Sequence, residues 1–206
     1  MIINDSFPKF DLPIDFIADD SITGDILNYY SNFPCKIKAG VFVLCTEGMV
    51  KATINLLEIV IRKNDFVIVL PNSFIQIHEV SSDTRISFAG FSSDFMLSGN
   101  YVEILLNSMP MILNSPVISL QDDIAGLYRN VYLLLIRAYT LPHSLENKDI
   151  IRSILAIFLQ GTKELYKRYG RKLDEPLRRE QELYRQFIQL LMAHYTSEHE
   201  VVFYAE

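Results

Sequence analysis

Residues 63–76 read KNDFVIVLPNSFIQ, and this stretch decides how the first half of the chain is interpreted. It begins with a polar turn at 63–65, continues as an apolar run at 66–70, and turns again at 71–73 before an alternating segment starts at Phe74. A short apolar run between two turn signals is typical of a buried β-strand. The stretch therefore predicts two consecutive strands joined by a tight turn.

The same pattern extends outward from this stretch over residues 36–93. Valine, isoleucine and phenylalanine recur there in short runs, which polar turns separate at 47–48, 62–65 and 81–83. Short β-rich runs spaced by about 8 to 12 residues predict an antiparallel sandwich or barrel. Residues 1–34 contain several prolines between short apolar pairs, and they predict an N-terminal arm with one or two short strands.

Helical periodicity replaces the strand pattern in the second half of the chain. Residues 94–109 predict one or two short helices, 110–116 a linker, and 116–120 a brief return to the barrel. Two long helices are predicted at 119–139 and 147–169. The main apolar stripe of the first consists of Ile124, Leu127, Tyr128, Val131, Leu134 and Leu135, and that of the second of Ile151, Ile154, Leu155, Phe158, Leu165 and Tyr169.

Both long helices also carry apolar residues beside these stripes. A helix that is apolar on several sides must be buried on several sides. This favours an antiparallel hairpin that packs on the barrel and on the same hairpin of a second chain, and internal partners for both faces are the alternative. The residues assigned to contact within such a homodimer are Leu133, Ile136, Ile150, Ile154, Ile157 and Gly161.

Composition excludes several classes of protein. The net charge of −6 argues against a general polyanion binder. No apolar run approaches the length needed to span a bilayer, and the N-terminus lacks the pattern of a secretory signal. Two cysteines, Cys35 and Cys45, form neither a disulfide framework nor a metal-ligand spacing, so they are interpreted as reduced thiols of a cytoplasmic protein.

The barrel segment predicts binding rather than catalysis. A catalytic metal needs about three nitrogen or oxygen ligands, and Glu47 and His78 are the only nearby candidates. No nucleophile motif and no phosphate-binding glycine loop is present, so we expect no metal, no cofactor and no catalytic residues. The aromatic and polar residues from which a small-molecule pocket could be built are Phe42, Phe66, Phe74, Gln76, His78, Arg85 and Phe88.

The chain ends with an amphipathic helix followed by the start of another. The helix is predicted from about Pro176 to His194, and Ser197 with Glu200 then forms a capping box. Residues 201–205 begin a further helix that has barely started at Glu206.

Two stretches of the chain resemble known families. Residues 63–76 resemble the Gly-Asp, strand, Pro-x-Gly stretch of cupin barrels, although Asn64 and Ser73 replace its glycines and Gln76 lies near the usual metal-binding histidine. The C-terminal stretch resembles the opening of the AraC-family DNA-binding domain, and the matching residues are Phe203, Tyr204, Ala205 and Glu206.

These resemblances imply an α+β chain from a transcription regulator. They imply an N-terminal arm and cupin-like effector-binding barrel at 1–118, a helical dimerisation hairpin at 119–172, and a linker with the incomplete start of an AraC-type DNA-binding domain at 173–206. Such a regulator reads DNA through two helix-turn-helix units, whose recognition helices would follow Glu206. The alternatives are a free-standing cupin-like binding protein that acts through protein partners, or a cupin enzyme with an unusual, metal-poor site.

Overall fold

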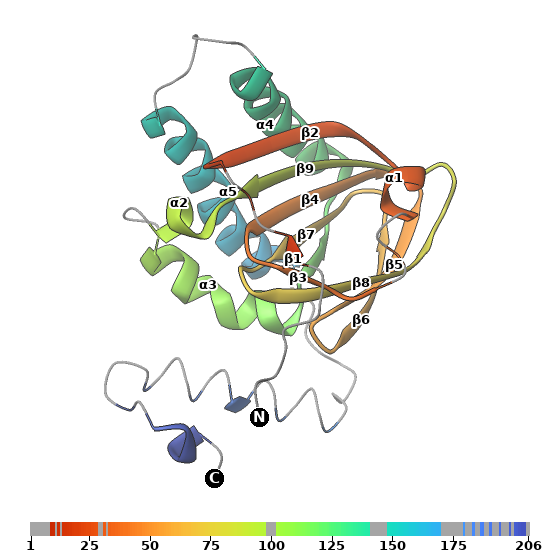
Figure 1. The fold of residues 1–206 in the computed structure, drawn as a ribbon. Helices are drawn as coiled ribbons and strands as arrows, with labels where there is room; N and C mark the ends of the chain where they lie inside the picture. The colour runs from red at the N-terminus through yellow and green to blue at the C-terminus, as the bar shows by residue number, and fades with distance from the viewer. Residues whose placement is uncertain are drawn as a thin grey trace.

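The structure is a computed structural model, and it describes residues 9–10, 12, 14–28, 31, 33–97, 102–140 and 148–169, with residues 179, 183, 186–187, 190, 194, 198 and 200–204 further on. Across these residues a pair of five-stranded sheets face each other, and helices cover the outer side of one of them (Figure 1). The α+β fold class predicted from the sequence is confirmed.

The two sheets are built from strands that alternate between them along the chain. Sheet A contains, in spatial order, β1 (Lys9–Phe10), β3 (Cys35–Ile37), β8 (Ser73–Val80), β5 (Met49–Ile54) and β6 (Leu57–Arg62). Sheet B contains β10 (Val117–Ser119), β7 (Asp65–Val69), β4 (Gly40–Glu47), β9 (Arg85–Phe91) and β2 (Phe16–Thr23). Neighbouring strands are antiparallel, except that β1 runs parallel to β3.

The helices are α1 (Gly24–Asn28), α2 (Ser93–Leu97), α3 (Val102–Asn114), α4 (Asp122–Thr140), α5 (Lys148–Tyr169) and a 3-10 helix, η1 (Val201–Tyr204). They follow the predicted order, except that α1 was not predicted and α3 extends beyond residue 109. The predicted hairpin helices are present as α4 and α5. No helix among the described residues is long and apolar enough to cross a bilayer.

Two local predictions are wrong. Residues 110–114 are not a linker, because α3 continues through Pro110 to Asn114. Proline removes one backbone hydrogen bond from a helix, but Ile112 in the next turn is only 2% exposed, and its burial favours helix continuation. The N-terminal arm contains more than short strands, since β2 is eight residues long and pairs with β9.

Sheet B is apolar on both faces, and β7 shows why. Val67 and Val69 point between the sheets, whereas Phe66 and Ile68 point to the helices. All five residues of β7 are therefore buried, which explains the unbroken apolar run in the sequence. The buried aliphatic residues between the sheets are Leu12, Ile37, Ala39, Val50, Ala52, Ile54, Ile61, Val67, Val69, Ile77 and Ile86, with Cys45 among them.

The predicted C-terminal helix lies largely outside the described residues. Of the described positions in it, residues 179, 183, 186–187, 190 and 194 are helical. The segment at 201–204 forms a 3-10 turn in which the Phe203 amide donates to the Glu200 carbonyl at 3.2 Å. Phe203 also contacts the ring of His194, with 5.2 Å between centroids. The predicted capping box involves Ser197, which lies outside the described residues.

Candidate functional site

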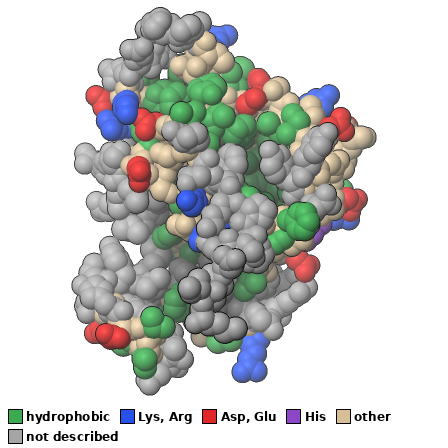
Figure 2. Space-filling model, viewed as in Figure 1, with side chains coloured by type: hydrophobic (Ala, Val, Ile, Leu, Met, Phe, Trp, Pro, Cys, Tyr) green, Lys and Arg blue, Asp and Glu red, His purple; other side chains and the backbone are tan. Residues whose placement is uncertain are grey.

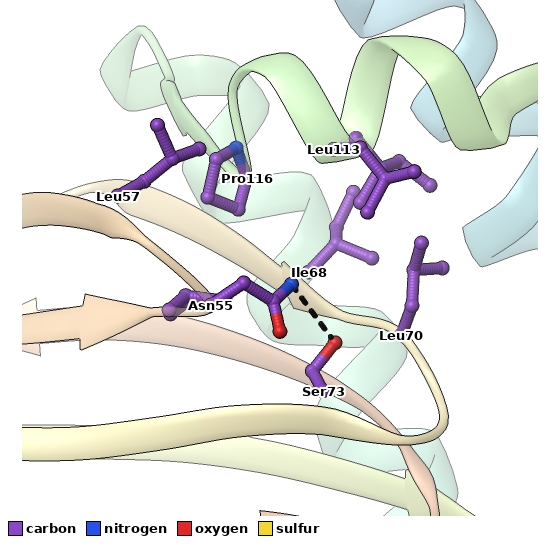
Figure 3. A pocket seen from close by; sticks show the side chains of 9 residues that line it. Asn55, Leu57, Ile68, Leu70, Ser73, Leu113 and Pro116 are labelled. Carbon is purple, nitrogen blue, oxygen red and sulfur yellow. Dashed lines mark hydrogen bonds between the residues drawn. The ribbon is translucent and has the colours of Figure 1, made fainter. Parts of the chain in front are cut away.

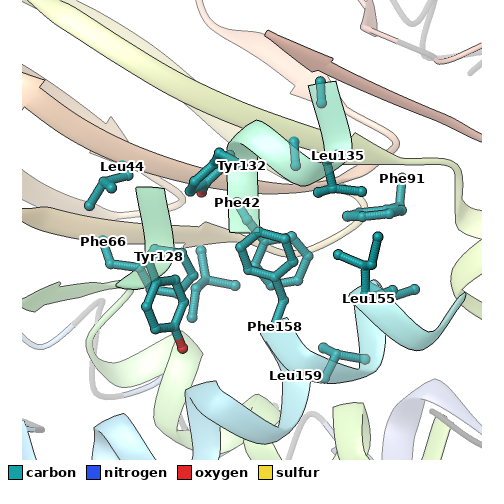
Figure 4. Packing of buried hydrophobic residues seen from close by; sticks show 14 of the residues in the cluster. Phe42, Leu44, Phe66, Phe91, Tyr128, Tyr132, Leu135, Leu155, Phe158 and Leu159 are labelled. Carbon is teal, nitrogen blue, oxygen red and sulfur yellow. The ribbon is translucent and has the colours of Figure 1, made fainter. Parts of the chain in front are cut away.

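Two of the predicted pocket residues, Phe42 and Phe66, lie on the helix side of sheet B rather than between the sheets. Both are at most 1% exposed. Their rings stack on Phe158 of α5, with centroid distances of 5.0 Å for Phe42 and 6.2 Å for Phe66. Figure 4 shows these rings meeting the hairpin side chains in one cluster. In the structure they therefore join the barrel to the hairpin.

Three further pocket residues lie on the outer face of sheet A. On β8, Phe74, Gln76 and His78 alternate with Ile75 and Ile77, which point between the sheets. Phe74 is 39% exposed, and the Lys36 ammonium lies 5.7 Å from its ring centroid.

The remaining polar and aromatic candidates have separate surroundings. The Nε2 atom of His78 is 2.7 Å from the Thr53 hydroxyl on β5. Arg85 is exposed at the start of β9, where its guanidinium donates to the Thr84 carbonyl at 3.3 Å. Phe88 is partly buried between the sheets. The structure therefore does not gather the seven predicted residues around one cavity.

The two candidate metal ligands also lie in different places. Glu47 is exposed at the end of β4, while His78 lies on the outer face of β8. Among the described residues, no three His, Cys, Asp or Glu side chains come together as a metal ion would require.

The structure contains a hollow where the barrel meets α3 (Figure 3), which the sequence did not indicate. The space between its walls is about 210 Å³ when open solvent is included, and the centre of a water-sized sphere can reach about 10 Å³ of it. Its walls come from the β5–β6 turn, β7, β8 and the end of α3, and the lining residues are Ile54, Asn55, Leu57, Ile68, Leu70, Ser73, Ile112, Leu113 and Pro116.

Two polar side chains lie among the aliphatic walls of this hollow. Asn55 has a left-handed backbone, with φ of 51°, and this conformation is one that asparagine tolerates in tight turns. Its Nδ2 donates to the Ser73 hydroxyl at 3.5 Å, and its Oδ1 accepts the Phe74 amide at 3.0 Å. The sequence predicted Ser73 in a turn and Asn55 within a strand, and neither pattern shows what the side chain faces.

The hollow is small for a preformed site. Pockets for drug-sized ligands typically span about 300 to 1,000 Å³, whereas the comparable volume here is about 10 Å³, roughly the room that one water molecule needs. An effector can therefore enter only if α3 moves away from the barrel.

The hairpin is attached to sheet B by an aromatic layer. Tyr128 and Tyr132 of α4 contact Phe158 of α5, with ring centroids 6.0 and 5.2 Å apart. Burial raises the pKa of both tyrosine hydroxyls above the ordinary range, and among the described residues neither hydroxyl has a hydrogen-bond partner. A Cβ atom at Gly161 would lie 2.4 Å from the Tyr128 hydroxyl, so this glycine allows close packing inside the chain.

The outer side of the hairpin exposes large apolar residues. Leu127 and Leu134 on α4 are 59% and 46% exposed, and Ile150 and Ile157 on α5 are 37% and 51% exposed. Each pair is seven residues apart, so its members share a helix face. We call these four residues the hairpin surface.

The predicted dimer residues are distributed over several environments. Ile150 and Ile157 belong to the hairpin surface, whereas Ile154 is only 3% exposed and lies in the core of its own chain. Leu133 is 43% exposed on another side of α4, and Ile136 is partly buried.

A second apolar region lies where β2 meets α4. The rings of Phe16 and Tyr139 meet edge to face there, with centroids 5.8 Å apart, and Tyr139 is 43% exposed. Figure 2 shows hydrophobic side chains gathered over this region of the molecule.

No family profile matches this sequence, and no curated protein sequence matches it. Several solved structures are similar. ToxT from Vibrio cholerae shares 11% sequence identity at a TM-score of 0.41, with 93% of this chain and 70% of ToxT covered. The AraC-like transcriptional activator CuxR shares 11% identity at a TM-score of 0.42, with 87% of this chain and 58% of CuxR covered.

A further likeness covers less than half of the chain. EutQ of Clostridium difficile shares 13% identity at a TM-score of 0.28, over 44% of this chain and 72% of EutQ. One ToxT structure contains bound (E)-4-(8-methylnaphthalen-1-yl)but-3-enoic acid. Likeness at this low level of identity and TM-score does not transfer a function to this chain.

Proposed function

We propose that this chain is the effector-sensing and dimerisation region of an AraC-like, cytoplasmic transcription regulator. The observation that carries the proposal is the hairpin surface: four exposed large apolar side chains on a helix pair whose other side is fully packed. Contiguous exposed apolar surface marks an interaction site. DNA contacts in such a regulator are made by helix-turn-helix units, whose opening residues 181–206 resemble.

The hairpin surface suits a second copy of the same chain. The seven-residue spacing within Leu127/Leu134 and within Ile150/Ile157 matches the spacing at which packed helices interdigitate. A two-fold axis would place the same surface on both sides of the interface, as in most homodimers. Within the proposal Ile154 supports the dimer only indirectly, by fixing α5 on its own barrel.

The hollow is where we place a small effector. Its polar groups on Asn55 and Ser73 could orient a ligand against the apolar walls. The α3 wall shares one core with the hairpin, because Ile112 belongs to the same cluster as Leu155 and Phe158 of α5. A ligand that displaces α3 would therefore act on the packing of α5. No catalytic role is included in this proposal.

The dimer is tested by two substitutions on the hairpin surface. Leu134→Glu and Ile157→Glu each introduce a charge that the interface would bury, so light scattering should give half the mass of the parent protein. Thr140→Glu, on an exposed position of α4 that faces another side of the helix than Leu127 and Leu134, is the matched control and should keep the parental mass. A monomeric parent, or unchanged mass in both glutamate variants, would refute the dimer.

The proposed effector site in the hollow has a separate test. A thermal-shift screen of small metabolites should yield a compound that raises the Tm of the parent and raises that of Asn55→Ala or Ser73→Ala less. A compound that stabilises all three proteins equally would place its site elsewhere.

A further inference from the structure

The polar floor of the hollow is held in one orientation by the backbone of Phe74. The backbone N–H of Asn55 donates to the Phe74 carbonyl at 2.7 Å, and the Asn55 Oδ1 accepts a hydrogen bond from the Phe74 amide at 3.0 Å. Because Oδ1 is the only acceptor in this side chain, the second bond fixes the carboxamide and turns Nδ2 towards Ser73 (Figure 3). Asn55 therefore presents N–H donors to the hollow.

The contact between Asn55 and Ser73 leaves donors unused. The Asn55 Nδ2 and the Ser73 Oγ are 3.5 Å apart, whereas N–H···O hydrogen bonds usually measure about 2.7–3.2 Å. Ser73 is only 5% exposed, and among the described residues its hydroxyl proton has no acceptor. A buried donor without an acceptor costs free energy. The pair therefore favours an acceptor oxygen that both side chains reach.

The room beside this pair suits a single oxygen. The centre of a water-sized sphere can reach about 10 Å³ of the hollow, roughly what one water molecule needs. An oxygen at this place accepts from the Ser73 hydroxyl and from the Asn55 amide, and such a bridge is nearly as favourable as a direct hydrogen bond.

The other walls disfavour a charged occupant. None of the described residues that line the hollow is charged, and apart from Asn55 and Ser73 they are aliphatic: Ile54, Leu57, Ile68, Leu70, Ile112, Leu113 and Pro116. A charged group placed against such walls loses its water and gains no partner charge. A carboxylate or an ammonium group is therefore disfavoured, and an uncharged aliphatic body fits.

We propose that the ligand of the hollow is an uncharged molecule with one acceptor oxygen, such as a ketone, ester or amide carbonyl, on an aliphatic body. Its oxygen takes the place of a water molecule between Asn55 and Ser73. Its aliphatic body takes the place from which the end of α3 withdraws. This inference rests on the proposed function, because it names the class of effector for the site assigned there.

The end of α3 is the wall that withdraws, and α5 holds it. The Tyr166 hydroxyl of α5 donates to the Ser115 carbonyl directly after α3, and the Ile68 amide of β7 donates to the Pro116 carbonyl at 2.9 Å. Tyr166 is 8% exposed, so its hydrogen bond is shielded from water. Withdrawal of α3 breaks this bond, and the closed hollow is stabilised by it.

A set of ring compounds of similar size tests the class of ligand. Cyclohexanone carries the acceptor, methylenecyclohexane has the same shape without it, and cyclohexanecarboxylate and cyclohexylammonium carry a charge. In NMR titrations of the full chain, cyclohexanone should shift the Asn55 side-chain NH₂ signals and bind about two- to tenfold more tightly than methylenecyclohexane. Both charged compounds should bind more weakly than either. Tighter binding of a charged compound, or equal binding of the two uncharged ones, would overturn the proposal.

Substitutions on the floor of the hollow test the acceptor contact. Ser73→Ala should lower the affinity for cyclohexanone about two- to tenfold and leave that for methylenecyclohexane unchanged. Asn55→Asp keeps an acceptor for the Phe74 amide and tolerates the left-handed backbone, but it replaces the donor by a charge and should abolish cyclohexanone binding.

Asn72→Asp is the matched control for Asn55→Asp. Asn72 also has a left-handed backbone, with φ of 68°, but it is exposed and does not line the hollow, so this variant should bind cyclohexanone as the parent does. Equal losses in the two aspartate variants would contradict the contact, as would a Ser73→Ala protein that binds both uncharged compounds more weakly.

Tyr166→Phe tests the moving wall. It weakens the closed state, so the affinities for cyclohexanone and for methylenecyclohexane should both rise about two- to tenfold. Unchanged affinities would show that α3 is not the wall that moves. A chain that binds none of these compounds refutes the class of ligand, while light scattering of the hairpin-surface variants decides the dimer independently.

Discussion

Two glycines in the hairpin should respond in opposite ways to the same substitution. Replacement of a helical glycine by alanine stabilises the helix by about 1 kcal/mol where the added methyl group meets no neighbour. Gly126 of α4 has nothing within 4 Å of an added Cβ atom, so Gly126→Ala should give this gain. At Gly161 of α5 the same atom would lie 2.4 Å from the Tyr128 hydroxyl.

The Tyr128 side chain cannot move aside without loss of packing. It is 6% exposed and its ring contacts Phe66 at 4.7 Å and Phe158 at 6.0 Å between centroids. Overpacking of a core costs about 1–3 kcal/mol. Set against a helix gain of about 1 kcal/mol, Gly161→Ala should lower the free energy of unfolding by up to about 2 kcal/mol, whereas Gly126→Ala raises it.

Removal of the Tyr128 hydroxyl should reverse the effect of Gly161→Ala on the free energy of unfolding. In Tyr128→Phe the nearest atom to the added Cβ becomes the ring carbon Cζ, at 3.4 Å, which is an ordinary contact. Gly161→Ala should then stabilise the protein by about 1 kcal/mol in that background. The hydroxyl itself has no hydrogen-bond partner among the described residues, so Tyr128→Phe alone should cost little.

Urea unfolding of the four proteins at one fixed concentration measures this cycle, since any dimer makes stability depend on concentration. A coupling energy near zero, or an equal gain from both glycine substitutions, would refute the packing described for Gly161. Light scattering of the same samples adds a second readout. If Gly161→Ala lowered the mass and left the stability of the chain unchanged, the glycine would act between chains, as the sequence suggested.

Two further predictions concern buried groups near β7. Asp65→Ala should lower the free energy of unfolding by about 2–3 kcal/mol, because the 5% exposed carboxylate accepts hydrogen bonds from both the Arg62 amide and the Ser119 hydroxyl. Urea unfolding measures this loss, and the control Asp83→Ala, at an exposed position, should change the free energy of unfolding by less than about 0.5 kcal/mol. Equal effects of the two substitutions would contradict this role of Asp65. Burial, with the nearby Asp65 charge, raises the pKa of the Cys45 thiol to about 11 from its ordinary 9.0. The folded state therefore binds this proton more tightly than the unfolded state, so its contribution to stability is complete below pH 9 and is lost as pH rises towards 11. Alkylation at neutral pH should modify the half-buried Cys35 before Cys45, and the reverse order would contradict the burial.

The barrel could be predicted because its strands have local signals. The turns at Gly48, Asn64 and Asn72 have backbones with positive φ, and these are glycine and asparagine positions visible in the sequence. The β2 strand was underestimated because its FIADDSIT sequence contains two aspartates and a bulge, which disguise an edge strand. The Pro110 turn of α3 was missed because tertiary packing there overrides a local breaker.

The candidate site was less predictable, because it depends on which side of an element each residue faces. Phe42 and Phe66 were assigned to the barrel interior, but sheet B has two buried faces, and the sequence does not mark which one contacts helices. Leu127 and Leu134 were placed in the core stripe of α4. The buried face instead centres on Ala125, Tyr128, Tyr132 and Leu135, so the apolar surface is wider than one neighbour can cover. The spacing of apolar residues shows that a helix has an apolar face, but it does not show which part of a wide apolar face is buried.

The turn at 63–65 shows what the side chain of an asparagine contributes at a position whose backbone conformation suits glycine. Asn64 adopts φ of 68°, which glycine would adopt equally well, but a glycine has no side chain to donate. The Asn64 side-chain Nδ2 donates to the Asp122 carboxylate at 2.5 Å, and the Asn64 backbone carbonyl accepts a hydrogen bond from the Leu120 amide at 3.0 Å. One residue therefore closes a barrel turn and holds the first turn of α4. Because the hairpin begins at this contact, residues 63–65 of the barrel are joined to α4 by hydrogen bonds as well as by the aromatic layer.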